Sequence, residues 1–167
     1  MSYTVLDLET ENIEHLGHKS SPFNLSNYIV AAGWSKDTNP VQSVYLPEDA
    51  AWLDDALAGC YILVAHNATF ELHWLMHRYP DKMHEWFKGS GRIWCTQLAE
   101  YLLSNQTELY PSLEDTSMKH GGTKKIDEVK LLWESGLKTS EIDKDLLMEY
   151  LAGPKGDIEN TRKVFLS

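Results

Sequence analysis

The chain has 167 residues, of which 43% are hydrophobic and 24% are charged, and its formal net charge is −10. This length suits one domain with its own core, and the composition is typical of a globular protein rather than a disordered one. The negative charge argues against a broad basic surface for nucleic acid, although bound cations could still offset it at a local site. No apolar run or basic leader predicts a membrane span or a secretory signal.

The first half of the chain predicts strands before helices. The apolar run YTVLDL (residues 3–8) predicts a buried strand, and a turn-rich stretch follows it. Residues 27–35 and 41–47 predict two further strands, joined by the turn sequence KDTNP. Residues 47–59 predict a short helix, with Pro47 and acidic residues in its first turn and Gly59 just past its end.

In the second half, strands alternate with helices. Residues 61–66 predict a strand, and residues 67–79 a helix that stops at Pro80. Residues 92–104 run from a short strand into a helix, and further helices are expected at 112–122 (Ser112 as N-cap, Gly121 as stop), 138–153 and 156–166. This order predicts an α/β fold, a mixed central sheet flanked by helices, in a single domain over residues 1–167.

The two cysteines, Cys60 and Cys95, both lie in apolar contexts. A disulfide between them is the less favoured interpretation. Free thiols in a reducing compartment are favoured, and we expect a cytoplasmic protein.

Asp7 and Glu9 are two carboxylates in the first strand, separated only by Leu8. Because side chains alternate along a strand, Asp7 and Glu9 are expected on the same face. Like charges at this spacing repel unless a cation lies between them. Two interpretations are open: a divalent metal site, or a strand that ends at Leu8 and enters a solvated loop.

Three more polar residues stand at starts of predicted helices. Asn67 and Glu71 are four residues apart and share a helix face, and Asp157 leads into the last helix. Each also has an ordinary structural explanation, because Asn67 and Asp157 are good N-cap residues and Glu71 suits the first turn of a helix.

Three motifs in order carry a resemblance. They are LDLET (residues 6–10), AHNATFE (residues 65–71), and Tyr150 followed by DIENT (residues 157–161). Together they resemble the DEDD (DnaQ-like) 3′→5′ exonucleases, which have the ribonuclease-H-like fold, and most closely the proofreading domains of phage family A DNA polymerases. The likeness spans essentially the whole chain, since WCTQLAEYLL, PSLEDTSMKHGG and KLLWESG are similar to the connecting helices of that family.

The chain departs from the family pattern at two places. Glu71 stands where the family commonly has aspartate. Tyr150 precedes Asp157 by seven residues instead of the usual four, and the usual position is Gly153. Tyr150 is therefore expected to contribute only if the AGPKG segment folds out as a loop, and an aromatic packed under the last helix is the alternative.

The resemblance implies a two-metal phosphodiester hydrolysis with Mg²⁺ or Mn²⁺. It implies that Asp7 bridges the two ions, that Glu9 and Asp157 complete the site of the attacking water, and that Glu71 holds the second ion through water. The catalytic set would be completed by Tyr150 as a water-orienting residue. Residues expected to contact substrate or to shape the pocket edge are Leu8, Thr10, His66, Asn67 and Phe70.

The expected substrate is a frayed or single-stranded DNA 3′ end. RNA trimming, or a non-catalytic module that binds a polymerase, are the alternatives. A polymerase partner could act in trans or as the rest of a longer chain, in the bacterial host cytoplasm if the protein is phage-encoded.

Two other features of the sequence are candidate sites. The basic stretch MKHGGTKK (residues 118–125) is interpreted either as a phosphate contact or, more often for such runs, as a solvated loop. His73 and His77 have a spacing that can bind zinc, but exposed or capped histidines are the favoured interpretation.

Overall fold

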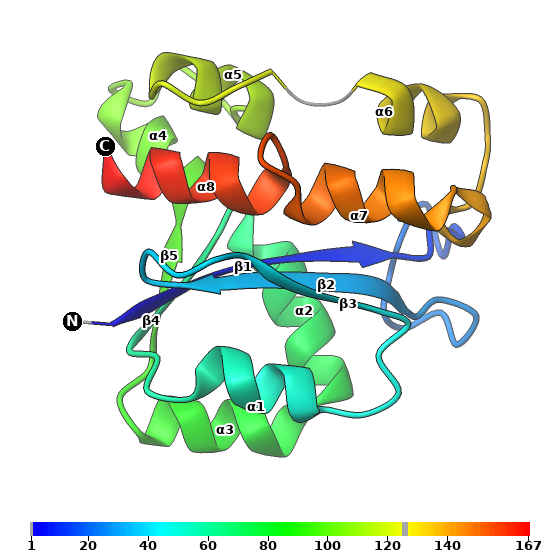
Figure 1. The fold of residues 1–167 in the computed structure, drawn as a ribbon, viewed down its shortest axis with the longest axis horizontal. Helices are drawn as coiled ribbons and strands as arrows, with labels where there is room; N and C mark the ends of the chain where they lie inside the picture. Colours follow the sequence, from blue (N-terminus) through cyan, green and yellow to red (C-terminus); the bar gives the residue numbers. More distant parts are fainter. Residues whose placement is uncertain (1, 125–126) are drawn as a thin grey trace.

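A computed structural model of the chain describes residues 2–124 and 127–167. One mixed sheet of five strands, in the order β3-β2-β1-β4-β5, lies at its centre (Figure 1). β1 pairs antiparallel with β2 and parallel with β4, while β2–β3 is antiparallel and β4–β5 is parallel. The strands span Tyr3–Thr10 (β1), Ile29–Lys36 (β2), Gln42–Tyr45 (β3), Ile62–Ala65 (β4) and Arg92–Cys95 (β5).

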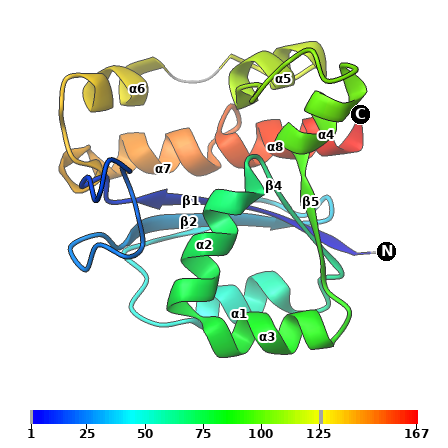
Figure 2. The same cartoon turned by 180° about the vertical axis from the view of Figure 1, so that it is seen from behind.

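Helices cover both faces of this sheet. α1, α2 and α3 lie on one face, and α7 and α8 lie on the other, with α4, α5 and α6 beyond them (Figures 1 and 2). The helices span Ala51–Leu57 (α1), Ala68–Arg78 (α2), Pro80–Lys88 (α3), Thr96–Leu103 (α4), Leu113–Lys119 (α5), Asp127–Glu134 (α6), Lys144–Ala152 (α7) and Asp157–Leu166 (α8), with a 3-10 helix at Thr139–Glu141. The predicted α/β class with a mixed, helix-flanked sheet is confirmed.

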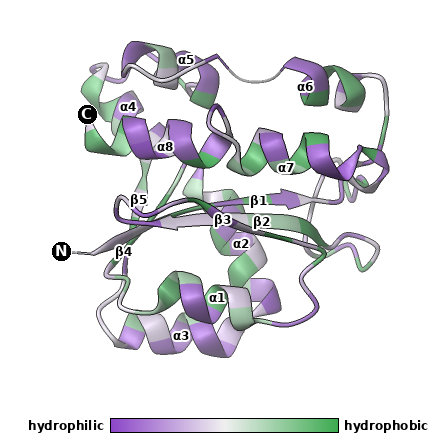
Figure 3. Cartoon of the chain, in the orientation of Figure 1, coloured by the Kyte–Doolittle hydropathy of each residue, from purple (hydrophilic) through white to green (hydrophobic). Residues whose placement is uncertain are grey.

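The alternation of side chains in β1 builds a separate core on each face. Leu6 and Leu8 pack with α1–α3, in a cluster that includes the fully buried Trp74. Val5 points to the other face and packs with Leu147, in a cluster formed with α6, α7 and α8. Figure 3 shows hydrophobic and hydrophilic residues alternating along α7 and α8, as expected for helices with one face on the sheet. Asp7 and Glu9 continue the Val5 side of β1 and therefore face the α7–α8 layer.

The α7–α8 junction comes unusually close to the sheet. Gly33 of β2 is the register partner of Asp7, and a Cβ built on Gly33 would lie 3.0 Å from Leu151 Cγ and 3.2 Å from Ile158 Cγ1. The absence of a side chain at this position lets the two helices approach β2 beside Asp7. Asp157, the first residue of α8, is thereby brought close to β1.

Several boundaries differ from the sequence prediction. α1 begins at Ala51 rather than near Pro47, and α7 begins at Lys144 with Asp143 as its cap, so the prediction that one helix starts at residue 138 is wrong. α3 is absent from the sequence prediction, in which Pro80 only ends the preceding helix. Pro80 is the first residue of α3, a position where the missing N–H of proline costs nothing.

Other local predictions are confirmed. Ser112 caps α5 by accepting a hydrogen bond from the Asp115 N–H, and Gly121 follows that helix with a φ of +74°. Cys60 and Cys95 are free thiols. Among helices in the described residues, none combines the length and the apolar character that crossing a membrane requires.

Candidate metal centre

Three carboxylates from opposite ends of the chain converge on one point. One ligand atom each from Asp7, Glu9 and Asp157 lies within 4.8 Å of the other two. Glu9 and Asp157 are buried, and Asp7 is half-buried. Oxygen donors at this spacing are the ligand set that hard divalent cations such as Mg²⁺ and Mn²⁺ prefer.

The sheet explains why these side chains meet. Asp7 and Glu9 lie near the carboxyl end of β1, and the parallel strand β4 ends at the same edge, just before His66. The register of β1 against β2 shifts between Glu9 and Thr10, an irregularity of the kind that re-aims side chains at functional sites. Asp157 is supplied by the start of α8.

Asp157 does not act as the N-cap of α8. Gly156 occupies the cap position, and Asp157 is the first helical residue. The helix N-terminus favours the negative charge of Asp157 through its dipole. The carboxylate is thus directed into the cluster instead of being folded back onto its own backbone.

Glu71 is a fourth acid beside this cluster. Its side chain is 3% exposed, and within the described residues no hydrogen bond reaches its Oε2 atom. Burial, and then the negative charge of Asp7, raise the pKa of Glu71 well above the ordinary glutamate value. A buried carboxylate oxygen that faces other acids fits a cation better than it fits the apolar interior.

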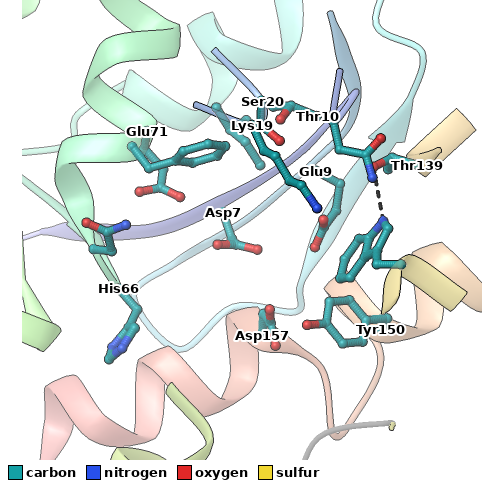
Figure 4. Close-up of a pocket in the computed structure, with 15 residues that line it drawn as sticks. Asp7, Glu9, Thr10, Lys19, Ser20, His66, Glu71, Thr139, Tyr150 and Asp157 are labelled. Atoms are coloured by element: carbon teal, nitrogen blue, oxygen red, sulfur yellow. Dashed lines mark hydrogen bonds between the residues drawn. The ribbon is translucent and has the colours of Figure 1, made fainter. Parts of the chain in front are cut away.

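A cavity of about 370 Å³ joins these groups (Figure 4). Every residue assigned to the site from sequence lines it: Asp7, Leu8, Glu9, Thr10, His66, Asn67, Phe70, Glu71, Tyr150 and Asp157. Sequence reasoning missed Asn12, Lys19, Ser20, Trp133 and Thr139, which also line it. Of these, Asn12, Lys19 and Ser20 belong to the turn-rich stretch after β1, where neither periodicity nor spacing signals a site.

Tyr150 reaches the cavity although seven residues separate it from Asp157. The intervening segment forms a tight loop, closed by a 2.9 Å hydrogen bond from the Gly156 N–H to the Gly153 carbonyl. A Cβ at Gly153 would lie 2.4 Å from Glu149, so this position has no room for a side chain. The Tyr150 ring packs edge-on against Trp133, with ring centroids 5.5 Å apart, and its hydroxyl points toward Asp157 in Figure 4.

His66 joins three segments at the edge of the cavity. Its Nε2 lies 3.0 Å from the Pro111 carbonyl, and its Nδ1 lies 2.9 Å from Thr96 Oγ1. Because a carbonyl only accepts, Nε2–H donates to Pro111, while Nδ1 shares a hydrogen bond with the Thr96 hydroxyl, which also lies 3.5 Å from the Ala65 carbonyl. His66 therefore holds the segment before α5 against the end of β4.

Asn67 precedes α2 in a left-handed conformation, with a φ of +60°, and its side chain makes no cap hydrogen bond. The Sγ of Cys95 instead accepts from the Ala68 N–H at 3.4 Å. The interpretation of Asn67 as a side-chain cap is therefore wrong, and its amide is left on the cavity wall. Leu8 is 4% exposed and, like the partly buried Phe70, also packs in the α1–α3 core.

The described residues of the basic stretch and the histidine pair lie outside the lining of this cavity. Lys119 pairs with Glu100 at 3.2 Å and with Glu108, and Lys124 pairs with Asp127 at 2.8 Å. Lys125 lies outside the described residues. His73 and His77 are exposed, and within the described residues the only metal-type grouping is that of the three carboxylates.

Comparison with protein-family models and with curated proteins finds no match to this chain.

Proposed function

We propose that the protein is a metal-dependent 3′→5′ exonuclease with a ribonuclease-H-like fold, acting on single-stranded or frayed DNA 3′ ends. The observation that carries the proposal is the convergence of Asp7, Glu9 and Asp157 within 4.8 Å from β1 and α8. The buried Glu71 and the Tyr150 hydroxyl in the same cavity support it, as does the resemblance of the three motifs to the DEDD exonucleases.

The carboxylates fit a pair of divalent ions. Asp7, Glu9 and Asp157 would hold one ion, and Asp7 with Glu71 would hold the other, with water between Glu71 and its ion. When bound, two such ions supply an activated water and neutralise the charge that develops on the departing oxygen.

The reaction is a hydrolysis. The water oxygen forms a bond to the phosphorus of the last phosphodiester, the bond from phosphorus to the 3′ oxygen of the preceding nucleotide breaks, and that oxygen takes up a proton. The products are a nucleoside 5′-monophosphate and a strand one nucleotide shorter, ending in a 3′ hydroxyl.

The side chains of the cavity have separate roles in this scheme. The Tyr150 hydroxyl, directed toward Asp157, orients the attacking water. Phe70 and Leu8 contact the terminal base or sugar, and the Asn67 amide hydrogen-bonds the nucleotide at the cavity wall. A single-stranded end suits this cavity, because its unpaired bases are free to stack on an aromatic side chain.

The test is a time course with 5′-labelled single-stranded DNA and RNA of equal length, in Mg²⁺, Mn²⁺ or EDTA. We expect a ladder of products shortened from the 3′ end of the DNA, absent in EDTA and reduced at least about 10³-fold in Asp7→Asn. Asp145→Asn, which changes an exposed acid in the first turn of α7, is the matched control and should retain full activity.

Two outcomes would contradict the proposal. One is that no product forms under any metal while the protein is folded. The other is that Asp7→Asn cleaves as fast as the wild type, which would point to a contaminating nuclease. Shortening of the RNA alone would correct the substrate to RNA.

A further inference from the structure

Lys19 lines the candidate metal centre and is the only lysine or arginine among the described residues that do so. It comes from the segment between β1 and β2, residues 11–28. Figure 4 shows its side chain extending over the cavity, with the ammonium group directed toward the carboxylates. Nothing in the sequence pattern assigned a role to this residue.

The backbone beside Lys19 is fixed by buried groups. The indole N–H of Trp74, which is fully buried, donates to the Ser20 carbonyl at 3.0 Å. The side-chain amide of Asn27, also fully buried, donates to the Ser21 carbonyl at 3.0 Å. On the other side, His15 and His18 exchange two backbone hydrogen bonds, at 2.8 and 2.9 Å. Lys19 is therefore an exposed side chain on an anchored backbone.

The beginning of this segment is held as firmly. The buried carboxylate of Glu11 accepts a 3.0 Å hydrogen bond from the Thr139 N–H, and the Asn12 amide donates to the Leu137 carbonyl at 3.1 Å. Both contacts tie the segment to the region just before α7. The segment that carries Lys19 is thus held at its beginning by residues just before α7, the helix that carries Tyr150.

The charges around the cavity indicate a phosphate as the ligand of Lys19. Four carboxylates line the cavity, and two divalent cations would offset their four negative charges. A phosphodiester then brings a further negative charge, which grows as water adds to the phosphorus. An ammonium group at the mouth of the cavity is the complement to that charge, since lysine binds phosphate as a flexible point charge.

We propose that Lys19 binds a non-bridging oxygen of the scissile phosphate at the 3′ end of the strand. This inference rests on the proposed function, because it names how the substrate of that site is held. It makes Lys19 a substrate-binding residue whose charge opposes metal binding and favours substrate binding. An ordinary solvated lysine, or one needed only for folding, would not combine these opposite effects.

The first test is binding in Ca²⁺, measured by fluorescence anisotropy with two thymidine oligonucleotides. One has an ordinary phosphodiester as its last linkage, and the other has an uncharged methylphosphonate there. We expect Lys19→Met to weaken binding of the first about 10-fold and to leave binding of the second unchanged, and Lys19→Arg to restore most of the loss. Lys88→Met, at the exposed end of α3, is the matched control and should bind both like the wild type.

The second test is a Mn²⁺ titration of the same variants. Lys19→Met should bind Mn²⁺ at least as tightly as the wild type, because a like charge has been removed. Thermal unfolding of Lys19→Met should match that of the wild type. A weaker Mn²⁺ affinity would mean that Lys19 supports the structure of the centre and would overturn the inference.

The results separate this inference from the proposed function. If DNA is shortened and Lys19→Met binds both oligonucleotides like the wild type, the role of Lys19 is wrong while the nuclease stands. If the phosphodiester-specific loss is seen but no strand is shortened, the phosphate site stands and the nuclease does not. If the wild type binds neither oligonucleotide, the inference is also overturned.

Discussion

Asp7 and Gly33 are register partners across β1 and β2. Gly33 makes room for the two helices that bring Asp157 to Asp7. Because Gly33 has no side chain, Leu151 of α7 and Ile158 of α8 pack directly over it. Asp157 is the residue before Ile158, so the fit of these helices on Gly33 determines how closely Asp157 approaches Asp7.

Gly33→Ala should weaken both the fold and the centre. The added Cβ would lie 3.0 Å from Leu151 and 3.2 Å from Ile158, contacts that force the helices outward. We expect the free energy of unfolding to fall by about 1–3 kcal/mol and Mn²⁺ affinity to fall with it, measured by denaturant titration and by calorimetry. Gly89→Ala, whose Cβ would meet its nearest atom at 3.4 Å, is the control. Wild-type Mn²⁺ affinity in Gly33→Ala would contradict this account of the junction.

Tyr150→Phe separates the hydroxyl from the ring. The ring contact with Trp133 is retained, so stability should change by less than about 1 kcal/mol. Nuclease activity should fall about 10- to 100-fold, because the group that orients the water is lost. The measurement is kcat on single-stranded DNA in Mg²⁺, with Tyr61→Phe as the control. Full activity in Tyr150→Phe would make Tyr150 a packing residue only.

Glu71 predicts how the stability of the metal-free protein depends on pH. The pKa of Glu71 is raised in the folded state, mainly by burial and by Asp7, so the folded state holds this proton at pH values where the unfolded state has lost it. Stability should therefore fall as the pH rises from the ordinary glutamate pKa through the raised value. In EDTA, the stability of Glu71→Gln relative to the wild type should therefore rise with pH.

Bound metal should favour the wild type over Glu71→Gln, the opposite of the effect of raising the pH in EDTA. Binding requires the Glu71 carboxylate to lose its proton, so Mn²⁺ affinity should increase with pH and Mn²⁺ should stabilise the wild type more than Glu71→Gln. Thermal unfolding at pH 6 and pH 8, with and without Mn²⁺, measures both effects. An equal increase in thermal stability on adding Mn²⁺ to the two proteins would show that Glu71 is not part of the metal centre.

Asn27→Ala should loosen the segment that carries Lys19. The buried Asn27 amide makes three hydrogen bonds, with the Ile13 N–H at 2.9 Å, the Ile13 carbonyl at 2.8 Å and the Ser21 carbonyl at 3.0 Å. Removing the amide leaves these backbone groups without their hydrogen-bond partner, and we expect the free energy of unfolding to fall by about 2–4 kcal/mol. Amide hydrogen exchange should accelerate in residues 11–28 and stay slow in α1. Uniform acceleration across the chain would show that Asn27 supports the whole fold instead.

The sequence predicted which site residues lie together on one element better than it predicted how distant elements bring them together. The pair Asp7 and Glu9 follows from the two-residue period of a strand, which needs no tertiary information. The arrival of Asp157 depends on how α7 and α8 pack over Gly33, a contact between distant segments that spacing does not reveal. Only the resemblance to a known family joined Asp157 to the first strand before the structure did.

The misread elements have a similar cause. Pro80 is compatible with the end of one helix and with the start of the next, and only the packing of Met83 against the core distinguishes the two. Lys19 escaped notice because a lysine in a turn-rich segment has no periodic pattern. Its position depends on a hydrogen bond from Asn27 within the same segment and on one from Trp74, which is remote in sequence.

The central claim is that the carboxylates of β1 and α8 form one metal-binding centre. A crystal of the protein soaked in Mn²⁺, with anomalous data collected near the manganese edge, tests it directly. We expect an anomalous peak among Asp7, Glu9 and Asp157, with a second peak on the Glu71 side of Asp7. The absence of any peak beside β1 in a well-soaked crystal, or an Asp157 side chain turned toward bulk solvent, would contradict it.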